Sequence, residues 1–517
     1  MRGGILEMSA FCDRLSTFYR RTVRVVFALC ASWLFFSSLF FRNFIDLQEH
    51  SWLLHNKVLA QGLFFGLILF FCAKCPCPSP SPARLRMIRA VSVFCAVILA
   101  ALWLRYAKMP PVFDAWDTQH AALAIRQGRG EYFEPGGYLY IYPHQSGLVL
   151  LHWLLQSFAP DDTNLFLCLN VLCYGVILIC LGSLAKAIGM GEGGALAVTW
   201  VAILFYPLAL YTVFVYGTLP GLALALVGLL LCISYCRMGQ LWRGLLAAAS
   251  LGLAIALKSN YQIFALGAIF YTLYNGLRRN KRCWVLLGLL CLFFVAGSRL
   301  PVLLVEHLTG LPLRSGLPHI GWVCMGLQDN GERGPGWYNN YIRNVYDAAG
   351  GDLQVQKDMI QKDLGEILPN LLRHPRATVR FFIRKNATQW NDPTFQGPWF
   401  YQVLAFFNET ELPPLADKLF SERGQHILVR LGSLFTTFIT GGLFLWAWSP
   451  RREKRHSGED LLAVILVGGF LFHTVWEAKA QYTLPYFVTV FPLALQGYRR
   501  FGYLAKQKRN ALKTGSI

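Results

Sequence analysis

Long apolar runs recur along almost the whole chain and are separated by short polar links. A helix needs about 17–25 apolar residues to cross roughly 30 Å of hydrocarbon, and most of these runs have that length. Short strands of alternating polarity, which are typical of a transmembrane barrel, do not occur. The pattern predicts an all-α polytopic membrane protein with about twelve transmembrane helices. The predicted spans cover residues 23–41, 52–71, 90–106, 163–184, 193–209, 213–234, 241–257, 261–277, 283–304, 426–447, 459–476 and 480–497.

Composition and charge agree with this pattern, because 55% of the 517 residues are hydrophobic and only 15% are charged. The net charge of +20 comes mostly from Lys and Arg in the links between apolar runs. This clustering follows the positive-inside rule and argues against nucleic-acid binding. The predicted cytoplasmic basic residues are Lys74, Arg84, Arg86, Arg89, Arg237, Arg243, Arg278, Arg279, Lys281, Arg282, Arg451, Arg452, Lys454, Arg455, Arg499, Arg500, Lys506, Lys508 and Arg509.

The first apolar run is too long for a cleaved signal peptide, and we interpret it as a signal anchor of a cell-membrane protein. Alternation of the spans then places both termini in the cytoplasm. Four parts follow from this alternation. They are an N-terminal two-span extension with a cytoplasmic link (1–89), a transmembrane core with the first outer loop 107–160 (90–304), an extracytoplasmic loop domain (305–425), and a C-terminal bundle with a cytoplasmic tail (426–517).

The first outer loop contains the densest set of candidate chemical groups. Asp114 and Asp117 follow a Pro-Pro pair that ends the preceding helix, so two carboxylates are expected where the membrane meets water. Apolar positions at helical spacing predict a short interfacial helix over 118–127, which glycines end. The apolar segment 148–158 is too short to span and is predicted to be interfacial or re-entrant.

The outer loop domain contains two amphipathic patterns. Apolar positions predict a helix over 353–372 that ends before Pro375. In the next segment, Arg376, Arg380, Arg384 and Lys385 share a predicted helix with apolar residues, and this helix is expected to rest on anionic headgroups.

Several segments carry a resemblance to a known family. They are Asp114 after an early span, GGYLYIYPHQSG (136–147), KNATQWNDPT (385–394) and EAKAQYTLPY (477–486). Together with a late, large outer loop, they resemble the GT-C superfamily of integral-membrane glycosyltransferases, and within it the protein O-mannosyltransferase-like branch. The resemblance covers most of the chain from about residue 90. It implies a GT-C-like fold and a polyprenyl-phosphate-linked sugar as donor.

The chemistry of such a transfer can be matched to residues. Displacing a lipid phosphate from an anomeric carbon needs a base for the acceptor proton and cations for the departing phosphate. Asp114 is the preferred base and Asp117 the second candidate, with helix capping as the alternative for both. Lys258, Lys479 and Arg299 are candidates for the donor phosphate, with membrane anchoring as the alternative.

Five further residues are expected to bind the sugar or the acceptor: Tyr138, His144, Gln145, Glu477 and Tyr482. For Glu477, a salt bridge with Lys479 is the alternative. No metal site is predicted. The aspartates and His120 could together hold a divalent cation, but their spacing is not diagnostic of a metal site.

We expect an inverting glycosyltransferase that acts on the extracytoplasmic face, with membrane lipids as its surroundings. A transporter or flippase of lipid-linked saccharide and a glycan polymerase or ligase are the alternatives. No repeat between the two halves favours a transporter. The acceptor stays open among protein, cell-wall polymer and glycolipid.

Overall fold

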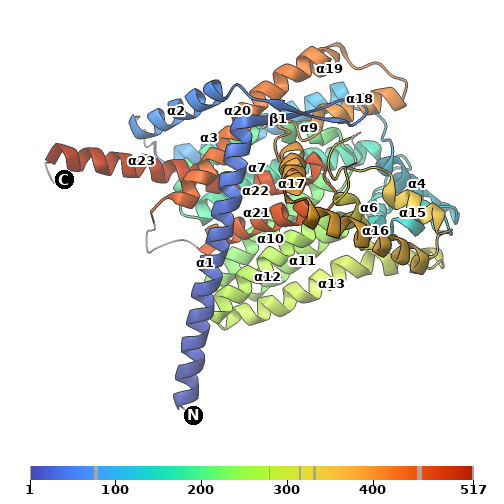
Figure 1. Ribbon diagram of the computed structural model, residues 1–517, viewed down its shortest axis with the longest axis horizontal. Helices are drawn as coiled ribbons and strands as arrows, with labels where there is room; N and C mark the ends of the chain where they lie inside the picture. The colour runs from blue at the N-terminus through green and yellow to red at the C-terminus, as the bar shows by residue number, and fades with distance from the viewer. Residues whose placement is uncertain are drawn as a thin grey trace.

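Figure 1 shows the computed structural model, in which helices make up nearly the whole fold. The structure describes residues 2–74, 80–278, 280–313, 316–329, 333–450 and 457–514. Helices of the first three hundred residues are α1 (Arg2–Phe40), α2 (Val58–Lys74), α3 (Pro82–Ala107), α4 (Asp114–Gln127), α5 (Tyr138–Ile141), α6 (Ser146–Leu155), α7 (Thr163–Ala187), α8 (Gly191–Leu204), α9 (Tyr206–Leu210), α10 (Thr218–Met238), α11 (Leu241–Leu257), α12 (Gln262–Leu277) and α13 (Arg282–Thr309). The later helices are α14 (His319–Gly326), α15 (Tyr341–Ala348), α16 (Leu353–Arg373), α17 (Pro375–Trp390), α18 (Gly397–Phe407), α19 (Pro414–Phe420), α20 (Glu422–Trp448), α21 (Ser457–Val475), α22 (Ala480–Thr489) and α23 (Phe491–Thr514).

Among the described residues, seven helices are long and apolar enough to cross a membrane. They are Thr17–Phe40 of α1, α3, α7, α10, α13, α20 and Gly458–Val475 of α21. The number rises to eight if α8 and the following segment Tyr206–Val213, which are bent by 62° relative to each other, form one span. These helices confirm the predicted class of a helical, multi-pass membrane protein. The predicted number of twelve spans stays a prediction.

Three predicted spans differ clearly from the helices observed, and one of them, 193–209, is broken at Phe205 between α8 and α9. Residues 51–55 form a strand, so the second helix begins at Val58 rather than Trp52. The segment 480–497 is divided at Val490 between α22 and α23. Pro492, the second residue of α23, has no amide to continue the hydrogen bonds of α22, which explains the break.

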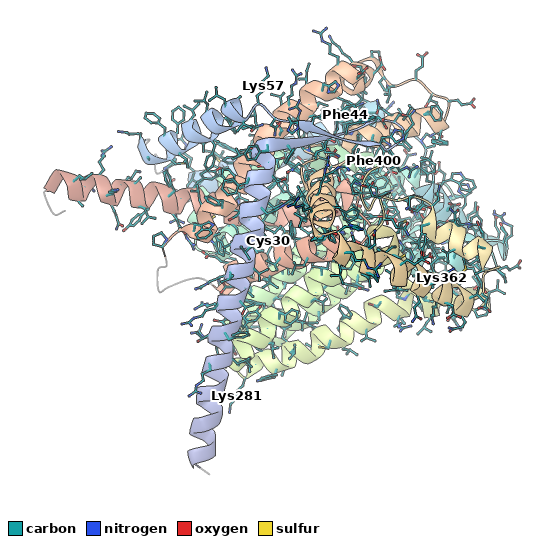
Figure 2. All side chains as sticks on the ribbon, viewed as in Figure 1. Cys30, Phe44, Lys57, Lys281, Lys362 and Phe400 are labelled. Carbon is teal, nitrogen blue, oxygen red and sulfur yellow. The ribbon has the colours of Figure 1, made fainter. Side chains whose placement is uncertain are left out.

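The one sheet in the described part of the chain was missed by the prediction. Strands β1 (Phe41–Ile45) and β2 (Ser51–His55) pair antiparallel, with Phe41 opposite His55. The hairpin follows α1 directly and carries Phe44 (Figure 2). The ring of Phe44 packs on His426 of α20, with ring centroids 4.7 Å apart. The fold is therefore all-α except for this hairpin, which fixes the loop between α1 and α2.

The main hydrophobic core lies inside the helical bundle. It contains buried side chains of α1, α3, α7, α8, α10, α11, α12, α20, α21, α22 and α23. Trp446, Tyr211 and Tyr261 are among its largest fully buried residues. Smaller clusters surround α4 and α6, so the predicted interfacial helices pack onto the bundle as a separate layer. α6 has only 10 residues, which agrees with its prediction as a helix that does not span.

The basic links gather at one end of the bundle. Hydrogen bonds between these links run from Arg237 to Ala187, from Asn280 to Cys236, from Arg282 to Met238 and from Arg499 to Gly189. Arg20 of α1 lies 3.5 Å from Asp460 at the start of α21. Arg279 and the predicted basic link 451–455 lie outside the described residues. The common location supports the predicted alternation, and which side of the membrane these links face stays a prediction.

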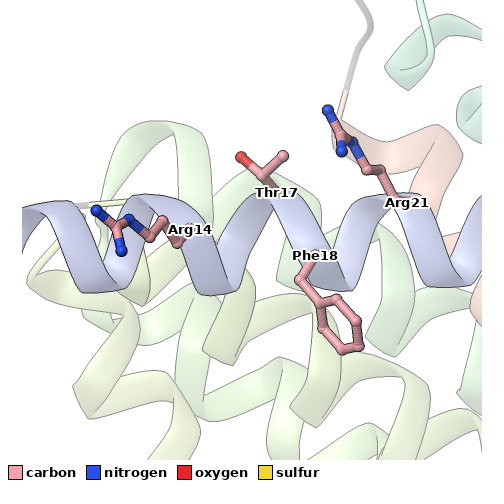
Figure 3. A pocket seen from close by; sticks show the side chains of 4 residues that line it. All are labelled: Arg14, Thr17, Phe18 and Arg21. Carbon is pink, nitrogen blue, oxygen red and sulfur yellow. The ribbon is translucent and has the colours of Figure 1, made fainter.

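Near the N-terminus, α1 carries an open hollow on its surface (Figure 3). Arg14, Thr17 and Arg21 lie along one side of the helix, whereas Phe18 points away from them. All four are exposed, as expected for a basic segment at a membrane surface.

The region predicted as an outer loop domain consists of α14 to α19. Its first predicted helix is confirmed as α16, whose N-cap Asp352 accepts hydrogen bonds from two backbone amides. Lys362 on this helix is exposed (Figure 2). α17 is also a helix, and Arg376, Arg380 and Arg384 on it are exposed, so their contact with headgroups stays a prediction. For Lys385 the prediction is wrong, because this residue is fully buried. Lys385 Nζ donates instead to the carbonyl oxygens of Gly326 and Trp476.

Candidate active site

α4 carries the two aspartates that the sequence singles out. The helix begins at Asp114 and ends at Gly128, which adopts the left-handed conformation with φ 65°. The N-cap is Phe113, with φ 52° and no capping side-chain hydrogen bond. The capping alternative for Asp114 and Asp117 is therefore wrong. Both lie in the first turn, where the helix dipole favours carboxylates without requiring them.

A buried hydrogen bond between His152 and Asp162 helps to hold α4 in place. His152 of α6 lies with Nδ1 2.6 Å from Asp162 Oδ2, and neither side chain is exposed. Asp162 Oδ1 also accepts a hydrogen bond of 2.8 Å from Gln119 of α4. Because Asp162 immediately precedes α7, these contacts connect α4 and α6 to a long apolar helix of the bundle. The Asp162 side chain, which lies outside the first outer loop, therefore helps to orient the helix that carries Asp114 and Asp117.

Lys258 directly follows α11 and is almost fully buried. Its Nζ donates to Thr218 Oγ1 at 2.9 Å and lies 4.9 Å from the ring centroid of Tyr216. The end of α11 is approached very closely by two glycines, Gly147 and Gly217. A Cβ at either position would lie about 2 Å from a carbonyl oxygen of α11. Glycine at these two positions therefore allows the first outer loop and the start of α10 to pack around Lys258.

Glu477 and Lys479 lie in the short connection between α21 and α22. Ala478 between them donates its amide to the carbonyl oxygen of Gly336 at 2.8 Å, which fixes the connection to the outer region. Glu477 is 3% exposed, and Lys479 is partly buried. The ammonium of Lys479 lies 3.1 Å from Glu49, a residue of the hairpin turn. A charged partner from the N-terminal extension therefore reaches this connection.

Asp114 acts electrostatically on both lysines. Desolvation raises the pKa of Asp114, and the charges of Lys479 and Lys258 oppose this increase. Asp114 nevertheless remains accessible to solvent. Burial and the repulsion of Lys479 lower the pKa of Lys258 to about 7. The four groups Asp114, Lys258, Glu477 and Lys479 therefore form one electrostatically coupled set, although they come from three separate parts of the chain.

The pKa values of Glu477 and Lys479, the two ionisable residues that follow α21, are both raised, which disfavours the charged form of Glu477 and favours that of Lys479. Desolvation raises the pKa of Glu477 to about 7 against the effect of Lys479, and Glu49 and Asp114 raise it further. For Lys479, burial lowers the pKa, but Glu49 and Glu477 outweigh burial and raise it. The alternative of a simple Glu477–Lys479 salt bridge is incomplete, because the ion pair that Lys479 makes is with Glu49.

Three of the predicted sugar-binding residues surround this charged set. The Tyr138 hydroxyl lies beside Asp114 and favours the charged form of this carboxylate. The hydroxyl is buried and does not meet the geometry of a hydrogen bond. Gln145 donates to the hydroxyl of Tyr216, whose ring faces Lys258. The ring of Tyr482 lies 5.5 Å from Lys258 Nζ. These contacts supply hydroxyl and amide groups around the two lysines.

Other predicted residues lie farther from the charged set. Arg299 is exposed on α13, and the cations that act on Asp114 are Lys479 and Lys258 instead. The ring of His144 packs against Trp322. The residue keeps contact with solvent, although desolvation by its surroundings and the charge of His319 lower its pKa to about 4. Asp117 is partly exposed, and desolvation and Asp114 raise its pKa to about 6. Asp117 thus neighbours the site without contacting the lysines.

The sequence did not indicate Glu49 or Tyr216 as site residues. Glu49 belongs to a hairpin that no alternation of polar and apolar residues predicted. Tyr216 lies in the segment that was predicted to begin a span. Within the described residues, no three His, Cys, Asp or Glu side chains are grouped so that they could hold a metal ion.

Together, fold and site define a helical, multi-pass membrane protein with a coupled set of acids and lysines at one end of its bundle. No protein-family model matches the chain, and no curated protein is found to be similar to it.

Proposed function

We propose that this protein is a membrane glycosyltransferase that moves a sugar from a polyprenyl-phosphate donor to an acceptor on the extracytoplasmic face. The observation that carries the proposal is the coupling of one accessible carboxylate, Asp114, with two lysines that come from distant segments, Lys258 and Lys479. This arrangement supplies both the base and the phosphate-binding cations that the reaction needs. The resemblance of the surrounding motifs to the GT-C superfamily supports the same reaction.

In the proposed reaction, the acceptor hydroxyl attacks the anomeric carbon of the donor from the side opposite the phosphate. Asp114 takes the hydroxyl proton as the new C–O bond forms and the bond from the anomeric carbon to the phosphate oxygen breaks. The polyprenyl phosphate leaves with the electron pair, and Lys258 and Lys479 stabilise its negative charge. The sugar is transferred with inversion of configuration.

The raised pKa of Asp114 fits the role of base, because a carboxylate accepts a proton more readily as its pKa approaches the working pH. Asp117 stays the second candidate for this role. Tyr138, Gln145 and Tyr482 lie close enough to the charged set to bind sugar hydroxyls. Glu477, with a pKa near 7, can accept or donate a hydrogen bond to the sugar or the acceptor. His144 and Arg299 stay candidates for more distant contacts.

The proposal is tested with the purified full chain, a panel of polyprenyl-phosphate pentoses and hexoses, and a membrane extract as the source of acceptor. We expect one donor to be consumed, with release of polyprenyl phosphate and transfer of its labelled sugar. In parallel, the protein is reconstituted into liposomes that carry the same labelled lipids. Movement of the intact lipid across the bilayer without release of polyprenyl phosphate would refute the proposal in favour of a flippase. Activity only with diphosphate-linked donors would favour a polymerase or ligase.

A further inference from the structure

Glu49 occupies the turn between β1 and β2, in the N-terminal extension and far in sequence from every predicted site residue. The turn holds Glu49 at φ 66°, and its amide donates to the carbonyl oxygen of Asp46 at 3.0 Å. The hairpin itself is fixed to the bundle, because Asn43 donates to the carbonyl oxygen of Asn391 at 2.7 Å. The position of the Glu49 carboxylate is therefore set by both local and tertiary contacts.

The carboxylate of Glu49 has three polar partners, and the residue is only 4% exposed. Oε1 lies 3.1 Å from Lys479 Nζ and accepts a 3.0 Å hydrogen bond from Gln396. Oε2 accepts a 3.0 Å hydrogen bond from Arg333. Gln396 in turn accepts from the amide of Gln481, two residues after Lys479. A buried carboxylate with this many donors is held in one orientation, and so is the ammonium beside it.

We propose that Glu49 is a positioning residue for Lys479, and that the N-terminal extension thereby contributes a group to the active site. This inference rests on the proposed function, in which Lys479 holds the donor phosphate. The Glu49 carboxylate keeps Lys479 protonated and draws its ammonium toward the hairpin. Without the Glu49 carboxylate, the carboxylates that still face Lys479 are Asp114 and Glu477. A protonated Lys479 would then pair with Asp114, the proposed base.

The surroundings of Lys479 limit what else could set its charge. Glu477 and Asp114 act as anions, Lys258 repels it, and Tyr338 presents its ring 5.9 Å from the ammonium. Arg333 competes with Lys479 for Glu49. Burial disfavours the charged form of Lys479, so removal of the nearest anion is expected to lower its pKa.

The test measures the protonation of Lys479 directly and does not depend on transfer activity. The purified full chain is trace-labelled with acetic anhydride between pH 7 and 11, and acetylation of Lys479 is followed by peptide mass spectrometry. Lys57, which is exposed beyond the hairpin, serves as an internal reference (Figure 2). Glu49→Gln should lower the labelling midpoint of Lys479, with at least tenfold more acetylation at a pH where the wild type is barely labelled.

Asp46→Asn is the matched control in the same turn. Asp46 accepts hydrogen bonds from the amide of His50 and from Trp52 Nε1, both at 2.9 Å, and the ion pair that Lys479 makes is with Glu49. Acetylation of Lys479 in the Asp46→Asn variant should equal that in the wild type. An equal change in both variants would overturn the inference, because the hairpin as a whole would then be responsible.

A second variant keeps the inference falsifiable if Glu49→Gln does not fold. Arg333→Met leaves Glu49 in place and removes a competing cation, so acetylation of Lys479 should decrease. Unchanged labelling in either folded variant would overturn the role of Glu49. In the transfer assay, Glu49→Gln should raise the donor KM about tenfold and also slow the single-turnover rate, because Lys479 is proposed to stabilise the charge on the departing phosphate. Altered labelling together with an inactive wild type would count against the proposed function and leave the pairing intact.

Discussion

Asp114→Asn separates proton transfer from every structural role of this side chain. Asparagine keeps the size of aspartate and part of its hydrogen bonding, but it cannot accept a proton at neutral pH. The N-cap of α4 is Phe113, so the substitution removes no cap. Asp114 is also accessible to solvent and makes no tight hydrogen bond to Tyr138. We therefore expect the thermal midpoint to change little.

The expected effect on catalysis is large. Loss of a general base typically lowers turnover by a factor of about 100 to 10,000. This range corresponds to about 2.7–5.5 kcal/mol of transition-state stabilisation. Removal of the anion should also lower the pKa of Lys258 and Lys479, because Asp114 raises both. A smaller rise in donor KM is therefore expected beside the loss of kcat.

The assay is single-turnover transfer from a purified polyprenyl-phosphate sugar, with thermal unfolding measured on the same samples. Asp117→Asn is the control, because Asp117 lies one turn away on the same helix and is partly exposed. It should retain most of its activity. An active Asp114→Asn beside an inactive Asp117→Asn would assign the base to Asp117. Near-normal transfer by both variants would refute the role of α4 in the reaction.

Four further predictions concern other parts of the molecule. Replacing Lys258 or Lys479 by Met should weaken donor binding about ten- to a hundredfold, measured by titration with labelled donor, and unchanged affinity in both variants would make them structural cations. The value of kcat/KM should fall as the pH rises through about 7, because Lys258 then loses its proton, and Lys258→Arg should move this decline to higher pH; a profile that Lys258→Arg leaves unaltered would contradict the assignment. Asp162→Ala should destabilise the fold by about 1–3 kcal/mol in thermal or denaturant unfolding, because it leaves the buried His152 and Gln119 without their hydrogen-bond acceptor, and a variant as stable as the wild type would disprove the anchoring of α4. Single cysteines at Gln240 and Ala348, in a cysteine-free background, should react with an impermeant reagent from opposite sides of the membrane, whereas labelling from the same side would invalidate the proposed topology.

The sequence predicted the helical membrane class and two of the coupled lysines, because both signals are local. Apolar length indicates a span, and a lysine at the end of such a run, such as Lys258, is conspicuous. Asp114 could be predicted in the same way, because the Pro-Pro pair indicates where the preceding helix ends. The amphipathic period of residues 353–372 likewise predicted α16 closely.

The missed features depend on tertiary contacts. Glu49 became a site residue only because the hairpin folds back toward the connection after α21, and no spacing in the sequence encodes that contact. The burial of Lys385 was missed for a related reason. Its arginine neighbours made the helix look like a membrane-surface helix, but carbonyl oxygens from two distant segments bind its ammonium. The cap of α4 was misjudged because Phe113, with its positive φ, follows no capping preference.

The repulsion between Lys258 and Lys479 has a consequence for the order of events in the proposed catalytic cycle. A polyprenyl-phosphate sugar is a phosphodiester with one negative charge, whereas the polyprenyl phosphate left after transfer is a monoester with nearly two, because its second pKa is about 6. Two neighbouring ammonium groups neutralise the doubly charged product better than the donor. The spent lipid should therefore stay bound longer than fresh donor, so its departure, rather than bond cleavage, would set the steady-state rate.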